Sequence, residues 1–167
     1  MTASARPNDG GSNELMTAVI VRAPGGPEQL EIGRVPIPKL EPGSVEIDVA
    51  ACALNRADLL QRRGAYPPPK GASDILGLEC AGVVRGLLGD VGGLNVGDRV
   101  MALLAGGGYA ARAVVPHGQV LPIPEGLSFA EGAAIPEAFL TASEALFQSG
   151  GLEAGQWVLI HAAAGGV

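Results

Sequence analysis

Short apolar runs separated by glycine- and proline-containing turns fill most of this sequence. Its 167 residues include 26 glycines and 13 prolines. Turns at that frequency favour short strands joined by tight loops. Because 47% of the residues are hydrophobic and only 17% are charged, the chain has enough apolar side chains for a buried core. Over the first 124 residues the pattern predicts a compact β-barrel or sandwich of about seven strands.

The third expected strand shows the clearest inside–outside pattern. Val45, Ile47 and Val49 share one of its faces, and Glu46 and Asp48 share the other. This alternation is typical of a strand that is half buried in a sheet. We expect strands at residues 16–22, 30–35, 45–54, 76–84, 100–104, 109–115 and 120–123.

A short helix is predicted directly after the third strand. Asn55 suits its N-cap, Asp58 its first turn and Gly64 its end. Residues 66–69 (YPPP) come next, and their three prolines exclude a helix there. Tyr66 is therefore expected on a rigid, extended loop.

The sequence changes character after residue 124. Ser128 and Glu131 predict a capping box at the start of a helix, and a second helix is expected over residues 137–149. The apolar run WVLIH at 157–161 reads as a strand buried on both faces, and the small-residue loop AAAGG follows it. A strand leading into a glycine loop is typical of the opening of a dinucleotide-binding unit.

The composition argues against several classes of partner. The net charge is −6 and no Lys/Arg cluster is present, so nucleic acid is not an expected partner. No run approaches the roughly 20 apolar residues of a membrane helix, and residues 1–14 lack the apolar centre of a secretory signal. Cys52 and Cys80 lie in apolar surroundings, and we expect two buried, unreactive thiols in a reducing compartment, the cytoplasm.

Five motifs together carry a family resemblance that covers residues 16–167. They are, in order, ALNRADLLQRRGAYPPP, ILGLECAGVV, VGDRVMAL, IPEAFLTASEAL and WVLIHAAAGGV. The set resembles the medium-chain dehydrogenase/reductase superfamily and, within it, the zinc-free quinone oxidoreductases of the zeta-crystallin type. It is most similar to the p53-inducible quinone oxidoreductase branch.

The resemblance implies a fold in two parts. A mainly β, GroES-like barrel domain would occupy residues 16–124, after a flexible N-terminal extension over 1–15. The first helices and first strand of an α/β Rossmann domain that binds NADPH would occupy 125–167, and this second domain would be incomplete. The resemblance also implies hydride transfer to a small-molecule quinone or enone, and a homodimer in the full-length protein.

The resemblance places Asn55, Asp58 and Tyr66 in the active cleft as catalytic residues. An alternative for Asn55 and Asp58 is helix capping alone, and for Tyr66 it is loop packing. Glu79, in an apolar strand, is expected to be structural and paired with Arg63 or Arg56. The residues expected to contact NADPH are Asn55, Tyr66, Thr141, Gly165, Gly166 and Val167.

No metal is expected. The catalytic zinc ligands of related alcohol dehydrogenases fall at Asn55, at Leu78 and near Glu137 in this sequence. An amide and a leucine cannot replace the thiolate and imidazole that zinc favours. A nicotinamide cofactor would do the chemistry while the protein orients two flat rings, and no residue is an obvious general acid.

A non-catalytic function stays open beside the enzyme. The chain would then be an inactive, truncated portion of a reductase, or a GroES-like interaction module without turnover.

Overall fold

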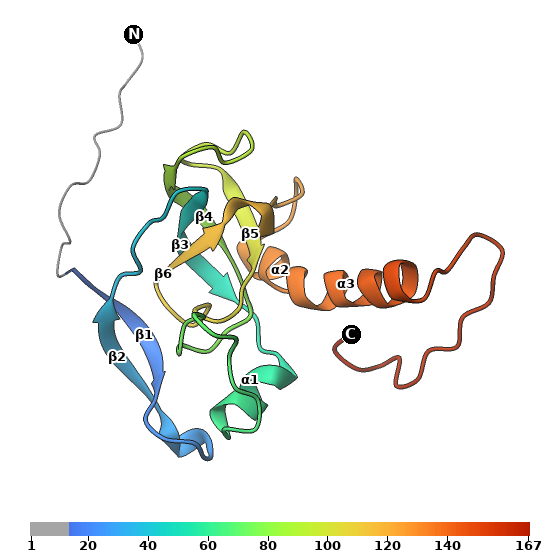
Figure 1. Ribbon diagram of the computed structural model, residues 1–167, viewed down its shortest axis with the longest axis horizontal. Coiled ribbons are helices and arrows are strands. Elements are labelled where there is room, and N and C mark those ends of the chain that lie inside the picture. Colours follow the sequence, from blue (N-terminus) through green and yellow to red (C-terminus); the bar gives the residue numbers. More distant parts are fainter. Residues whose placement is uncertain (1–13) are drawn as a thin grey trace, which may run out of the picture.

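The computed structural model describes residues 14–167 of the chain. The predicted flexible extension therefore lies outside the described residues except for Glu14 and Leu15. Figure 1 shows the strands gathered into one body, from which α3 and the residues after it extend as an arm. The strands are β1 (Leu15–Val21), β2 (Leu30–Pro36), β3 (Ser44–Cys52), β4 (Glu79–Leu88), β5 (Arg99–Leu103), β6 (Arg112–Pro116) and β7 (Val120–Pro122). The α-helices are α1 (Arg56–Arg62), α2 (Phe129–Ala133) and α3 (Pro136–Ser143), and the short elements are η1 (Pro27–Gln29), η2 (His117–Gln119) and η3 (Glu144–Ser149).

The strands form two antiparallel sheets. One has five strands in the order β6-β3-β4-β5-β7, and the other is the β1–β2 hairpin. The hairpin is joined to the loop before β6 by a bridge between Ala18 and Ala110 and by a 2.8 Å bond from Val19 N–H to the Tyr109 carbonyl. The mainly β architecture predicted from the turn pattern is confirmed.

The hydrophobic core lies on the face of the large sheet that carries the apolar residues of the alternating pattern in β3. Val45 and Ile47 of β3 are fully buried, and Glu46 and Asp48 point to the opposite face. The buried residues of this cluster are Val45, Ile47, Cys80, Val84, Val91, Val100, Ala102, Leu104, Ala113, Val115 and Val120. Burial of such aliphatic side chains is the main force holding the sheet together.

The helix α2 covers the other face of the sheet at one end. Ala133 packs there with Ala81, Met101 and Ile123. The helix begins as predicted, because Ser128 and Glu131 form a capping box in which the Ser128 N–H donates to the Glu131 carboxylate at 2.8 Å.

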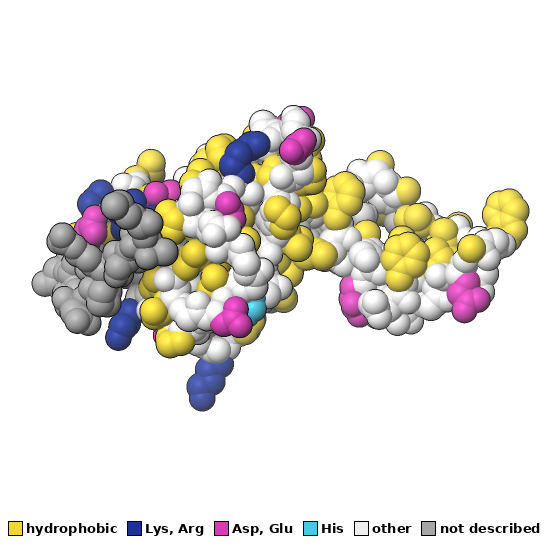
Figure 2. Space-filling view, turned by 90° about the horizontal axis from the view of Figure 1, so that it is seen from above, with side chains coloured by type: hydrophobic (Ala, Val, Ile, Leu, Met, Phe, Trp, Pro, Cys, Tyr) yellow, Lys and Arg dark blue, Asp and Glu magenta, His cyan; other side chains and the backbone are white. Residues whose placement is uncertain are grey.

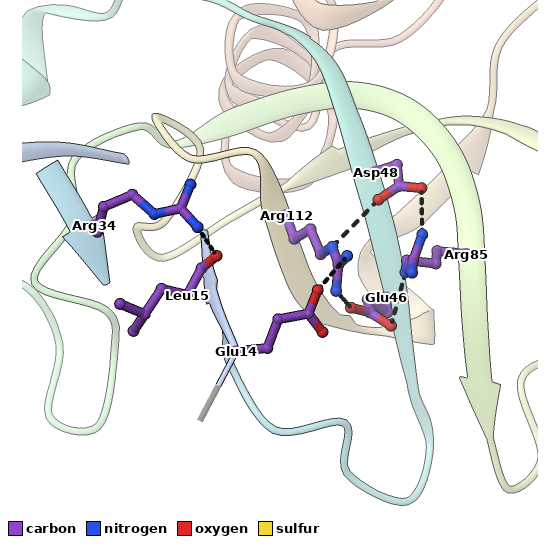
Figure 3. A network of polar contacts seen from close by, with 7 residues as sticks. All are labelled: Glu14, Leu15, Arg34, Glu46, Asp48, Arg85 and Arg112. Atoms are coloured by element: carbon purple, nitrogen blue, oxygen red, sulfur yellow. Dashed lines mark hydrogen bonds and ion pairs between the residues drawn. The ribbon is translucent and has the colours of Figure 1, made fainter. Parts of the chain in front are cut away.

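Charged side chains on the polar face of β3 connect three neighbouring strands (Figure 3). Arg112 of β6 contacts Glu46 at 3.4 Å and Asp48 at 3.5 Å, and Arg85 of β4 contacts Asp48 at 3.2 Å. Glu14 also reaches Arg112, at 3.5 Å. These contacts favour the observed pairing of β3 with β4 and β6, although partly exposed ion pairs contribute little stability each.

The backbones of β3 and β4 come unusually close at Gly82. A Cβ atom at this position would lie 2.0 Å from the Asp48 carbonyl oxygen. The register of the pair shifts between Val49 and Ala51, next to this contact. Only glycine allows this approach.

Two strands begin three residues later than predicted, and the strands expected to end at Leu54 and Val84 end at Cys52 and Leu88. The strand expected from Leu76 begins only at Glu79, because Gly77 has a φ of +104° and its loop pairs with residues 108–109. The strand expected from Tyr109 begins at Arg112, because residues 109–111 pair with β1 instead. The second predicted helix begins at Pro136, a residue well suited to a first helical position, and its last six residues form the π-helical turn η3.

The prediction of a buried strand at Trp157–His161 is wrong. The segment forms no strand, and Trp157 is 99% exposed. In Figure 2, hydrophobic side chains lie exposed along the arm to which this segment belongs. A strand of a parallel sheet needs neighbouring strands for its hydrogen bonds and covering helices for its faces, and residues 14–167 supply no parallel partner.

Candidate active site

Asn55 lies where β3 has ended and α1 begins. Its backbone is extended, with φ −117° and ψ 155°, and α1 starts at the next residue. The Asn55 N–H donates to Asp58 Oδ2 at 2.8 Å, which is the reciprocal half of a capping box. Asn55 is the N-cap residue of α1 as predicted, and Asp58 caps the helix through this bond, while the Asn55 side-chain amide bonds to Glu79.

Asp58 also connects α1 to two distant loops. Its carboxylate accepts bonds from the Asn55 N–H at 2.8 Å, the Gly77 N–H at 3.1 Å and the Tyr109 hydroxyl at 2.8 Å. The side chain is only 3% exposed. Burial, and then the bond to Asp58, raise the pKa of Tyr109 far above its usual value, so the phenol stays protonated and donates.

Gly77 is required by the close approach of these loops. A Cβ atom there would lie 2.6 Å from Tyr109 Cδ1 and 2.7 Å from Gly108 Cα. The left-handed φ of +104° also disfavours any other residue. Sequence reasoning recognised neither Gly77 nor Tyr109 as part of the site, although Tyr109 directly follows three consecutive glycines.

Glu79 is the second buried carboxylate, with 2% of its surface exposed. Its Oε1 accepts a bond from Asn55 Nδ2 and its Oε2 a bond from the Glu137 backbone N–H, each at 2.8 Å. The predicted arginine partner is wrong, because two amide donors satisfy the carboxylate instead. The Glu137 N–H is one of the free donors in the first turn of α3, where a negative charge is favoured.

Tyr66 and Glu137 face a hollow of about 190 Å³. Tyr66 comes from the predicted proline loop and is 47% exposed. Leu78, the residue before Glu79 in the chain, is one of the apolar residues that line the hollow. The lining consists of Gln61, Tyr66, Pro68, Pro69, Leu78, Leu103, Leu104, Ala105 and Glu137.

Glu137 has a perturbed carboxyl group. Burial, then the charges of Glu79 and Asp58, raise its pKa above the usual value. Sequence reasoning had considered this residue only as the place of an absent zinc ligand. The predicted helix over 137–149 includes Glu137, but its place in an apolar hollow depends on distant residues such as Tyr66 and Leu103.

The remaining predicted cofactor residues are not gathered at the hollow. Thr141 lies on the exposed side of α3, one helical turn after Glu137 and therefore on the same face. Gly165, Gly166 and Val167 are exposed in an irregular segment, where the Gly165 N–H bonds to the Ala162 carbonyl at 2.8 Å.

A second, larger depression of about 560 Å³ lies between the β1–β2 hairpin and the end of β3. Its walls are apolar and include Ile32, Val49 and Leu54. Cys52 also lines it and is exposed, so the prediction of two buried thiols holds only for Cys80. Burial raises the pKa of Cys80 to about 12 and also raises that of Cys52, which keeps both thiols protonated.

Both depressions adjoin the buried network, the larger one through Tyr109, which bonds to Asp58, and the smaller one through Glu137, whose N–H bonds to Glu79. The smaller hollow is the better candidate site, because it also holds the predicted site residue Tyr66. Within residues 14–167, no group of three or more His, Cys, Asp or Glu side chains is arranged to hold a metal ion. In the same part of the chain, every helix is too short or too polar to cross a membrane.

The alcohol dehydrogenase GroES-like domain family matches residues 41–125, about half of the chain. The human synaptic vesicle membrane protein VAT-1 homolog-like is 38% identical over 157 residues, which are 94% of this chain and 38% of that protein. Its crystal structure aligns with a TM-score of 0.83 over 92% of this chain and 50% of that one.

Two further relatives are named as oxidoreductases. The mouse quinone oxidoreductase is 36% identical over 156 residues, 92% of this chain and 47% of that protein. The crystal structure of CurK enoyl reductase aligns with a TM-score of 0.81 at 30% identity, over 92% of this chain and 48% of that one. The chain thus spans half or less of the length of the relatives it matches. The family match and the shared fold together show that this chain belongs to the alcohol dehydrogenase GroES-like family of the medium-chain dehydrogenase/reductase superfamily.

Proposed function

We propose that this chain carries the substrate side of an NADPH-dependent, zinc-independent oxidoreductase that reduces quinones or related enones by hydride transfer. The observation that carries the proposal is the hollow beside the buried carboxylate network. Tyr66 stands on a proline loop at this hollow, and apolar walls from Leu78 and Leu103 face it. A flat ring fits between an aromatic side chain and aliphatic walls.

The residues around the hollow suit the nicotinamide end of the cofactor. When bound there, the nicotinamide would supply the hydride. Asn55 is held by Asp58 and Glu79, and Thr141 lies on the face of α3 that carries Glu137. We propose that Asn55, Tyr66 and Thr141 position the two reacting rings, with Asp58 holding Asn55 in place.

The described residues do not form a binding site for the pyrophosphate end of the cofactor. Gly165, Gly166 and Val167 lie in an exposed, irregular segment. Their assignment to the pyrophosphate loop rests on the resemblance of HAAAGGV to a dinucleotide-binding turn. We propose accordingly that residues 16–124 form the GroES-like domain and that residues 125–167 begin the NADPH-binding domain.

Independence from zinc is part of the proposal. The amide of Asn55 is already bonded to Glu79, and Leu78 offers no ligand atom. The remaining side chains of the hollow do not supply a thiolate or an imidazole. For the full-length protein we further propose a cytoplasmic homodimer.

A second candidate function is an interaction module without turnover. It is favoured by the apolar depression beside β3 and by the exposed apolar side chains at Trp157–Ile160. Large exposed apolar patches are typical of protein contacts. Measurement of turnover separates this candidate from the enzyme.

The test uses this chain extended through a complete nucleotide-binding domain and washed with a chelator. We expect quinone-dependent oxidation of NADPH without added metal. Tyr66→Ala should lower kcat/KM about tenfold, because loss of about 1.4 kcal/mol of ring contact corresponds to that factor. Ser143→Ala, an exposed position on α3, serves as the matched control and should leave kcat/KM unchanged. Failure to oxidise NADPH with any quinone or enone would overturn the proposal and favour the interaction module.

A further inference from the structure

Reduction of a quinone or enone by hydride needs a proton as well. The hydride leaves an oxyanion or enolate on the substrate, and a positioned acid accelerates its protonation. The sequence pointed to no such acid. Among the residues that line the hollow, Glu137 is the one with a carboxyl group.

Glu137 is held in place through its backbone and leaves its side chain available. Its N–H, in the first turn of α3, donates to Glu79 at 2.8 Å. Glu137 lines the same hollow as Tyr66. None of the ion pairs among residues 14–167 involves Glu137.

The groups around this carboxyl are acidic or neutral. Glu79 acts on it from β4 and Asp58 from α1, and the phenol of Tyr66 shares the hollow. Residues 113–167 contain five glutamates and no lysine or arginine, so α3 and the segments beside it in sequence bring no cation. Burial, Glu79 and Asp58 raise the pKa of Glu137, in that order. A carboxyl group with a raised pKa stays protonated to higher pH than an ordinary glutamate, which favours proton donation.

We propose that Glu137 is the catalytic proton donor of this site. The inference rests on the proposed reductase function and names the residue that completes its chemistry. The substrate receives both electrons as hydride from the reduced nicotinamide. The O–H bond of Glu137 then breaks and its proton forms the new O–H or C–H bond of the product. The carboxylate that remains is reprotonated by water.

The primary test is Glu137→Gln in the chain extended through a complete nucleotide-binding domain. Gln keeps the size of the side chain but has no transferable proton. We expect kcat to fall about 100-fold with KM little changed. The pH–rate profile of the wild type should decline at alkaline pH, and that of the variant should not. Glu144→Gln, an exposed position in η3, is the control and should retain the wild-type profile.

Glu79→Gln gives a readout that a purely structural role would not move. Removing the charge of Glu79 should lower the pKa of Glu137, so the alkaline limb should shift to lower pH. A carbon-13 titration of the Glu137 carboxyl in the wild-type protein measures the same group without turnover, and it should titrate above a reference exposed glutamate.

The outcomes separate the two proposals. An active wild type whose Glu137→Gln variant keeps kcat and the alkaline limb would overturn the role of Glu137 alone. The same holds if Tyr66→Phe, rather than Glu137→Gln, removes the limb, or if the Glu137 carboxyl titrates like an exposed one. An inactive wild type would overturn the proposed function, and the role of Glu137 would fall with it.

Discussion

Tyr109→Phe is the cleanest perturbation of the buried network. The Tyr109 hydroxyl donates to Asp58 at 2.8 Å, while its ring packs beside Gly77. Phenylalanine keeps the ring and removes only the hydroxyl. Asp58 retains its bonds from the Asn55 and Gly77 N–H groups. The change in stability therefore reports a single hydrogen bond to a buried carboxylate.

The expected loss is about 2 kcal/mol. A hydrogen bond to a charged group contributes about 1.5–3 kcal/mol, and removal of one of several donors leaves the carboxylate only partly unsatisfied. With a urea m-value of about 2 kcal/mol/M, the unfolding midpoint should fall by about 1 M at an unchanged slope. Tyr66→Phe is the matched control, because Tyr66 is 47% exposed. Its free energy of unfolding should change by less than about 0.5 kcal/mol.

The same variant carries a pH signature. The pKa of Tyr109 is raised in the folded state, first by burial and then by its bond to Asp58. The protonated Tyr109 hydroxyl therefore contributes fully to the stability of the fold below the unfolded-state pKa of about 10. This contribution declines as the pH rises towards the higher pKa of the folded state. The stability difference between wild type and Tyr109→Phe should shrink above about pH 10. Equal midpoints for wild type, Tyr109→Phe and Tyr66→Phe at pH 7 would refute the network.

Three further predictions concern other parts of the chain. Gly77→Ala should prevent the loop from meeting Tyr109, because of the close contacts and the positive φ, and should yield unfolded or aggregated protein in a solubility assay. Ser128→Ala should remove the N-cap of α2 and lower the free energy of unfolding by about 1 kcal/mol in thermal denaturation. The 167-residue chain by itself should neither bind NADPH tightly nor turn over quinone, and its exposed run at 157–161 should cause self-association in sedimentation velocity. Leu159→Lys in that run should restore the monomer, and an unchanged association state would contradict this assignment.

Much of the strand content could be predicted because local patterns determine it. The alternation in β3 identified Val45 and Ile47 as core residues, and both are fully buried. The capping signals at Asn55 and Ser128 also correspond to real helix starts, since a cap depends on neighbouring residues alone.

The sequence-based predictions are wrong where contacts between residues far apart in the chain determine the structure. Glu79 lacks the expected arginine because the N-terminus of α3, far along the chain, supplies a donor. Tyr109 belongs to the site only through a bond to Asp58, 51 residues away. Trp157–His161 has the composition of a buried strand, but pairing requires neighbours that a local pattern cannot reveal.

A single-turnover reaction under anaerobic conditions measures the proposed zinc-independent hydride transfer itself. The chelator-washed protein, extended through a complete nucleotide-binding domain, is mixed with NADPH deuterated at C4 of the nicotinamide and then with a naphthoquinone. We expect transfer of the label out of NADPH with a primary isotope effect, at a rate that added zinc does not change. Absence of transfer to quinones and enones alike, or transfer only after zinc is restored, would contradict this expectation.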